Sequence, residues 1–252
     1  MIAALGIVMI SCDDDDEGNP ADPQPGKIEV TQAYGDSSSI VGRVNQFREQ
    51  AGRTLNTAPG ASSGRREINW DGVPAELISP LLLPADFFNP TVTSAPDARK
   101  RGLVYFPSTA ALLVSDRNFT EVDTIFRGQF KAFSKNKLFS PRGTNISEIR
   151  FQLPGSTTAA YVTSFGIIFS DVDNADATMI EAYEGNNLIG TARAQVADRN
   201  YSFVGLRTNS RRITRIRIMA GNANLAAGVQ DGSARDIVVM DDLIYSEPRA
   251  FN

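Results

Sequence analysis

Alternating apolar and polar positions predict that most of this chain forms short β-strands. Ile149, Phe151 and Leu153, for example, alternate with charged or amide side chains. Similar alternation or a short apolar run predicts strands at 126–132, 148–153, 165–169, 179–183, 188–192, 202–206 and 214–218. Residues 184–187 (EGNN) predict the turn of a hairpin between two of these strands. The segment 237–245 is apolar on both faces, which is typical of a central, covered strand.

One helical pattern precedes the strands. Ile40, Val44 and Phe47 recur at helical spacing and predict a short helix over 39–51 with Ser39 as its N-cap. Helices and strands do not alternate along the chain, which argues against a doubly wound α/β fold. The sequence therefore predicts a mostly β protein, an antiparallel jelly-roll-like β-sandwich with one short N-terminal helix.

The first residues form an apolar run, 1–11, which is too short to span a bilayer because a spanning helix needs about 20 residues. It fits the apolar region of a signal peptide. Its end, Met9-Ile10-Ser11-Cys12, resembles the lipobox of bacterial lipoproteins, which implies that Cys12 is lipidated and becomes the first residue after cleavage. The alternative is a buried free cysteine beside a chance apolar start.

A tether follows Cys12. The acidic run Asp13–Glu17 resembles the export signal of surface-exposed Bacteroidetes lipoproteins, although a solvated acidic tether is the alternative. Residues 18–26 contain three prolines and two glycines, which is typical of an extended linker. We therefore expect a signal peptide over 1–11, a tether over 12–39 and a β-sandwich domain over 40–252. The expected location is the outer membrane, lipid-anchored and exposed on the surface, so the membrane is a partner through the lipid anchor.

Four motifs stand in the order GRREINWDG (64–72), KLFSP (137–141), FGIIFSDVD (165–173) and VVMDDLIYSEP (238–248). They resemble a family of secreted bacterial jelly-roll or β-sandwich proteins of unassigned activity, whose members typically read GRR-INWDG, LFSP, FG-VFSDVD and VVMDDFIYGEP. The resemblance runs from about residue 40 to residue 248 and implies a single domain. The C-terminal motif is similar to carbohydrate-binding and adhesion modules, but a fold alone does not imply a function.

Composition and charge exclude several function classes. The chain has no histidine and one cysteine, which excludes histidine-based triads, histidine metal ligands and intramolecular disulfides. The net charge is −4, and Asp13–Glu17 contribute −5 of it, so the remainder sums to +1. Such a near-neutral body gives no electrostatic basis for nucleic-acid binding. Catalytic serine, phosphate-loop and dinucleotide motifs are absent, so we assign no catalytic residue.

Aspartates in two short segments are candidate Ca²⁺ ligands, because this hard cation prefers oxygen donors. They are Asp171, Asp173, Asp176, Asp241 and Asp242. The first two are two residues apart on a strand and should face the same side, whereas the last two are adjacent and should face opposite sides. We expect the strand that ends at Asp171 to lie near the final strand, which brings like charges together. A structural Ca²⁺ ion would offset this repulsion; the alternatives are turn capping or pairing with arginines, namely Arg212, Arg215 and Arg217.

A second candidate site is a ligand-binding surface around Trp70, the chain's single tryptophan. Trp70 and Asp71 lie in the second half of the first motif, and a tryptophan on a sandwich surface can stack on a sugar ring. Arg65 and Arg66 could bind a carboxylate or a phosphate. The alternatives are a core position for Trp70 and salt bridges for the two arginines.

We expect a surface lipoprotein with a jelly-roll binding or adhesion module, for a glycan or the extracellular matrix. One alternative is a structural envelope or matrix protein without a small ligand. Another is a carboxylate-based glycoside hydrolase, which would need two of Asp171, Asp173, Asp241 and Asp242 to face each other, about 5–5.5 or 6.5–9.5 Å apart, across a cleft.

Overall fold

A computed structural model describes residues 27–107, 109–232 and 234–251. The expected signal peptide, Cys12 and the acidic run Asp13–Glu17 lie outside the described residues. One α-helix, α1 (Ser37–Ala51), and three short 3₁₀ helices, η1 (Ala75–Leu77), η2 (Asp97–Arg99) and η3 (Thr124–Phe126), occur in the described part of the chain. The strands are β1 (Glu29–Gly35), β2 (Arg65–Ile68), β3 (Leu103–Phe106), β4 (Leu112–Ser115), β5 (Leu138–Pro141), β6 (Ile146–Phe151), β7 (Ala160–Tyr161), β8 (Ser164–Val172), β9 (Met179–Glu184), β10 (Asn187–Arg193), β11 (Ala197–Arg207), β12 (Arg215–Met219), β13 (Val239–Ser246) and β14 (Arg249–Ala250).

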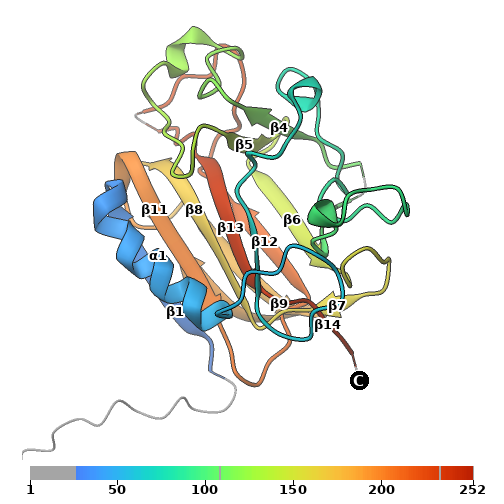
Figure 1. Cartoon of the computed structure of the whole chain (residues 1–252). Helices are drawn as coiled ribbons and strands as arrows, with labels where there is room; N and C mark the ends of the chain where they lie inside the picture. Colours follow the sequence, from blue (N-terminus) through green and yellow to red (C-terminus); the bar gives the residue numbers. More distant parts are fainter. Residues whose placement is uncertain (1–26, 108, 233, 252) are drawn as a thin grey trace, which may run out of the picture.

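The strands form two facing antiparallel sheets, so the protein is a mostly β sandwich, as predicted (Figure 1). The larger sheet has the order β1-β11-β8-β13-β5-β4, and β2 also pairs with β13. The smaller sheet has the order β10-β9-β12-β6-β3, and β14 pairs with β7 in a separate two-stranded ribbon. The predicted central strand is confirmed, since β13 lies inside the larger sheet with β8 on one side.

The main core lies between the two sheets. Phe165, Ile167 and Phe169 of β8 alternate with their neighbours and point into it, opposite Ile216 and Ile218 of β12. This period of two is the reason that the alternation in the sequence predicted these strands correctly. The predicted hairpin is also confirmed, because β9 pairs with β10 across the turn at 185–186.

Helix α1 covers the outer face of the larger sheet (Figure 1). Ile40, Val44 and Phe47 of α1 pack against the side of β8 and β11 that faces away from the main core. The helix begins two residues earlier than predicted, because Asp36 rather than Ser39 is the N-cap and its carboxylate accepts a hydrogen bond from the Ser39 N–H at 2.8 Å.

Two glycines of the larger sheet make room for the Phe47 ring. A Cβ atom at Gly205 would lie 2.5 Å from the Phe47 ring, and one at Gly166 would lie 2.7 Å from it. Real Cβ contacts are not that short, so the ring can approach the sheet only because both strands lack a side chain there. Gly166 and Gly205 therefore allow helix α1 to pack closely on β8 and β11.

Two expectations about the chain's organisation are wrong. The sandwich does not begin at residue 40, because β1 forms the edge of the larger sheet and pairs with β11 over its whole length. The predicted strand at 126–132 is instead η3 followed by irregular chain. Its alternation is real, since Phe126 and Phe130 are buried, but they belong to a loop that packs on the larger sheet, in a third apolar cluster with Leu113 of β4, Leu138 of β5 and Val239 of β13. No helix in the described part of the chain has the length and apolar character needed to cross a bilayer.

Candidate functional site

Trp70 is a core residue, which corrects its expected role in ligand binding. Its side chain is 1% exposed, stacks on Phe139 with ring centroids 3.8 Å apart, and meets Phe88 edge-on. Its indole N–H donates to the main-chain oxygen of Asp241. The ring therefore has no free face for a sugar. Asp71 is also largely enclosed, and the nearest cation, Lys135 Nζ, lies 4.0 Å from its carboxylate.

The two adjacent arginines, Arg65 and Arg66, form ion pairs and hydrogen bonds inside the protein. Arg66 is fully buried and forms a bidentate pair with the Glu247 carboxylate, through Nε and Nη2 at 2.8 Å each. Arg65 bonds to Glu67 at 2.6 Å and to the main-chain oxygens of Gly52 and Arg53. The expectation that they bind an anion is therefore not supported. Both arginines instead form salt bridges and main-chain hydrogen bonds within the protein.

Asp241 and Asp242 face the same side of the sheet, not opposite sides. Met240 pairs with Phe169 and Leu243 with Ile167, so two residues of β13 stand opposite one residue of β8. The extra residue forms a β-bulge, which cancels the usual alternation. As a result, Ser134 Oγ lies within hydrogen-bond distance of both carboxylates, at 3.4 Å from Asp241 and 2.6 Å from Asp242.

Both carboxylates of this pair are satisfied by protein groups. The Phe133 and Ser134 N–H groups donate to Asp241 Oδ2, and Arg48 of α1 pairs with Asp242 at 3.1 Å. Burial and the adjacent Asp242 carboxylate raise the pKa of Asp241, and burial also raises the pKa of Asp242. The expected metal role is not supported here, and the partner is Arg48 rather than Arg212, Arg215 or Arg217.

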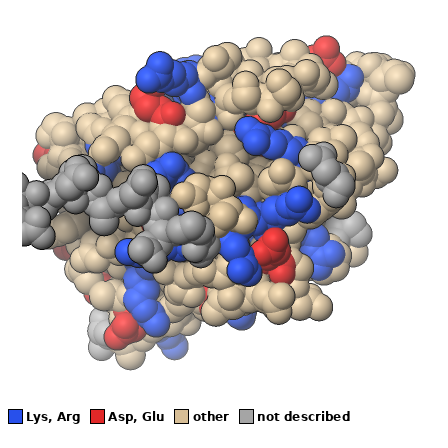
Figure 2. All heavy atoms as spheres, turned by 90° about the horizontal axis from the view of Figure 1, so that it is seen from below, with Lys and Arg blue, Asp and Glu red and all other residues tan. Residues whose placement is uncertain are grey.

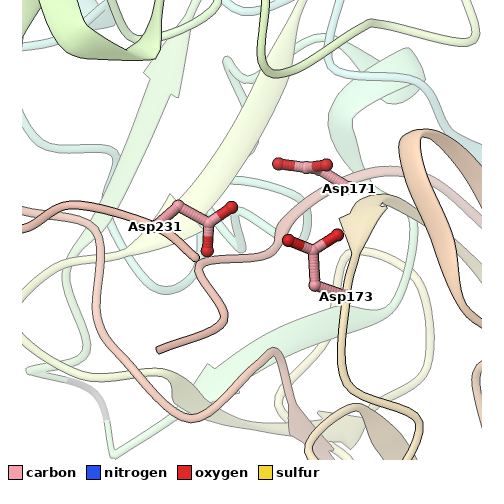
Figure 3. Close-up of side chains that lie close together, drawn as sticks. All are labelled: Asp171, Asp173 and Asp231. Carbon is pink, nitrogen blue, oxygen red and sulfur yellow. The ribbon is translucent and has the colours of Figure 1, made fainter. Parts of the chain in front are cut away.

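Three other carboxylates converge at the end of β8. One oxygen of each of Asp171, Asp173 and Asp231 lies within 4.8 Å of the other two (Figure 3). Asp171 and Asp173 face the same side, as predicted. Asp231 comes from the loop before β13, and no sequence motif points to it. The pocket that they line, which we call the acidic pocket, has a volume of about 500 Å³.

Asp171 is the most buried member, with 1% exposure. It lies opposite an irregular stretch of β11, and the Arg199 N–H donates to its Oδ1 at 2.6 Å. Its Oδ2 is buried and has no hydrogen-bond partner within the described ranges. Burial raises the pKa of Asp171 to about 7, because the carboxylate has lost water without gaining a cation.

Asp176 lies outside this group. Its side chain is 91% exposed, and its carboxylate lies 3.6 Å from the Arg193 guanidinium. Within the part of the chain that the structure describes, Asp171, Asp173 and Asp231 are the one group of three residues able to hold a metal ion. The expected five-residue set is thus divided among three places, and Asp231 completes one of them.

A larger groove lies at the open edge of the smaller sheet, and we call it the β3 groove. It has a volume of about 760 Å³ and is formed by the ends of β3 and β6 with the loops around residues 82–91 and 109–111. Phe106 is 43% exposed at its wall, and the Arg150 guanidinium lies 3.4 Å from the centre of that ring. Asp86 and Gln152 add polar groups.

The face seen from below in Figure 2 carries separated Lys and Arg side chains, several of them beside an acidic side chain. Pairs of this kind in the fold include Arg211–Glu184 at 2.8 Å and Arg215–Glu148 at 2.8 Å. On the part of this face that grey atoms do not cover, basic and acidic side chains are therefore intermixed.

A scan against protein-family models, a search of curated proteins and a search of solved structures each found no match.

Proposed function

We propose that this chain is a lipid-anchored surface protein whose β-sandwich binds a glycan in the β3 groove. The observation that supports this proposal is an exposed aromatic ring, Phe106, in a groove of about 760 Å³. Ligand sites in proteins are clefts of about 300–1,000 Å³ that combine apolar surface with a few polar groups. The β3 groove has that size and that composition.

The chemistry of the groove suits a sugar ring. Arg150 covers one face of the Phe106 ring, and the other face can accept the C–H groups of a pyranose. The Asp86 carboxylate can accept hydrogen bonds from hydroxyl groups. The Arg150 guanidinium can donate to the ring oxygen or to hydroxyls. Arg150 is already held in place, because its Nε and Nη2 both bond to Glu148 Oε1 at 3.2 and 3.1 Å. A side chain that is ordered before binding loses less entropy when the ligand arrives.

We expect Phe106→Ala to weaken glycan binding about tenfold, because loss of an aromatic contact costs about 1 kcal/mol or more. The measurement is a glycan array with purified protein, followed by titration of the best-retained glycan. Tyr34→Ala is the matched control. Tyr34 is also an exposed aromatic residue, 59% exposed, but it lies on β1 at the edge of the larger sheet, whereas the groove lies at β3 in the smaller sheet. Equal losses in both variants, or no retained glycan, would contradict the proposal.

The lipid anchor rests on the sequence Met9-Ile10-Ser11-Cys12, because a thiol is the group that receives the lipid. We expect Cys12→Ala to abolish incorporation of labelled palmitate and to leave the precursor unprocessed or soluble. Replacing Asp13–Glu17 with alanines is the matched control, since it retains the thiol and should retain the label. Labelling of the Cys12→Ala protein equal to that of the unaltered chain would refute the anchor.

A further inference from the structure

The three carboxylates of the acidic pocket form no direct ion pair with a basic side chain of the described residues. No lysine or arginine in the described segments comes within 4.0 Å of the carboxylate oxygens of Asp171, Asp173 or Asp231. Arg199 lines the pocket, yet its guanidinium pairs at 3.8 Å with Asp198 instead. This arrangement contrasts with Asp242, where Arg48 supplies the opposite charge.

Hydrogen bonds reach some of the carboxylate oxygens in the acidic pocket, but one buried carboxylate oxygen accepts none from the described residues. Asp231 accepts from the Ile237 N–H at 2.8 Å and from Gln129 Nε2 at 2.9 Å. Asp171 Oδ1 accepts from the Arg199 N–H, whereas Asp171 Oδ2 has no partner among the described residues. A buried carboxylate oxygen without a hydrogen bond costs free energy, unless a bound ligand such as a cation contacts it.

Figure 3 shows the three carboxylate groups around one common space, with Asp171 and Asp173 on one side and Asp231 on the other. Three carboxylates with facing oxygens within 4.8 Å can bind one cation together. The absence of histidine from the chain and the oxygen-only donor set suit a hard divalent ion. A pocket of about 500 Å³ also leaves room for water ligands, and Ca²⁺ accepts six to eight oxygens in flexible geometry.

We propose that Asp171, Asp173 and Asp231 bind one Ca²⁺ ion, with Asp171 Oδ2 as the buried ligand. The ion would link the end of β8 to the loop before β13, two segments about 60 residues apart in sequence that otherwise meet here through Asp236. The Asp173 and Asn174 N–H groups donate to the Asp236 carboxylate at 3.3 and 3.0 Å. Calcium would thus strengthen a junction that the protein already makes. The site shares no lining residue with the β3 groove, so this proposal does not depend on the proposed function.

The test is isothermal titration of the full chain, stripped with chelator, with CaCl₂. We expect one binding site per chain, and affinity at least tenfold weaker in Asp231→Asn and in Asp173→Asn. Asp173 is exposed, so its variant keeps the experiment decisive if Asp231→Asn does not fold. Asp176→Asn is the matched control, because Asp176 is an acidic residue of the same loop with its carboxylate in solvent. It should bind Ca²⁺ as the unaltered chain does.

Thermal melts provide a second readout. Saturating CaCl₂ should raise the melting midpoint of the unaltered chain and of Asp176→Asn, because an ion that binds the folded state alone stabilises it. The rise should be clearly smaller in Asp173→Asn, because that variant binds the ion at least tenfold more weakly. The proposal is wrong if CaCl₂ at millimolar concentration gives no binding heat and no midpoint shift. It is also wrong if Asp176→Asn loses affinity as much as Asp173→Asn does.

Discussion

Replacing Glu247 with alanine is expected to lower the free energy of unfolding by about 3–5 kcal/mol, because it leaves the Arg66 charge buried without its partner. Both side chains are inaccessible to solvent and meet in a bidentate pair at 2.8 Å. Arg66 also donates to the main-chain oxygens of Lys100 and Ala58, so it cannot swing out to water without breaking those bonds too. Urea denaturation of both proteins measures the difference.

Two further variants separate burial from charge pairing. Glu49→Ala removes the acid of an exposed pair with Arg53, 3.9 Å apart, and should change stability by less than about 0.5 kcal/mol. The double variant Arg66→Met with Glu247→Leu removes both buried charges and should recover most of the loss. A loss below about 1 kcal/mol in Glu247→Ala would show that Arg66 finds other partners.

Trp70→Ala is expected to cost about 3–5 kcal/mol, because the indole fills the core between Phe139 and Phe88. Its backbone has φ 64°, a left-handed conformation that is unfavourable for a bulky residue, so packing must outweigh that strain. Since the variant loses the single tryptophan, unfolding has to be followed by circular dichroism rather than by fluorescence.

Trp70→Phe and Tyr34→Ala are the controls for this experiment. Trp70→Phe retains an aromatic ring and should lose less than the alanine variant does. Tyr34 is exposed, so its replacement should change stability by less than about 1 kcal/mol. If Trp70→Ala behaved like Tyr34→Ala, the side chain would not be the core residue that its burial indicates.

Local periodicity predicted the strands because it reports directly on which side chains face the core. Ile149 and Phe151 of β6 are buried for that reason, as are Ile216 and Ile218 of β12. The same signal misled at 126–132, because Phe126 and Phe130 belong to a loop that covers part of the larger sheet, where no strand partner is needed. Alternation thus identifies burial, and it identifies a strand only when another strand lies alongside.

The candidate sites were harder to predict, because they depend on contacts between distant segments and on local irregularities. The bulge in β13 turned Asp242 toward Arg48, and nothing in the sequence around it signals an extra residue. Asp231 precedes Gly232, so in the sequence it resembles an ordinary turn residue. It joins Asp171 only because the loop before β13 folds back over the end of β8. Phe106 is likewise placed at the groove by strand order.

The position of β1 determines how the domain would respond to a mechanical load. A tether attached before residue 27 would transmit any pull into Glu29, the first residue of β1. Seven residue pairs join β1 to β11 in antiparallel register, and the Glu29–Arg207 ion pair lies at the end that is loaded first. A pull along the strand axis would shear these hydrogen bonds together instead of opening them one by one. Under such a pull the edge strand would therefore resist detachment, because many hydrogen bonds would bear the load at once.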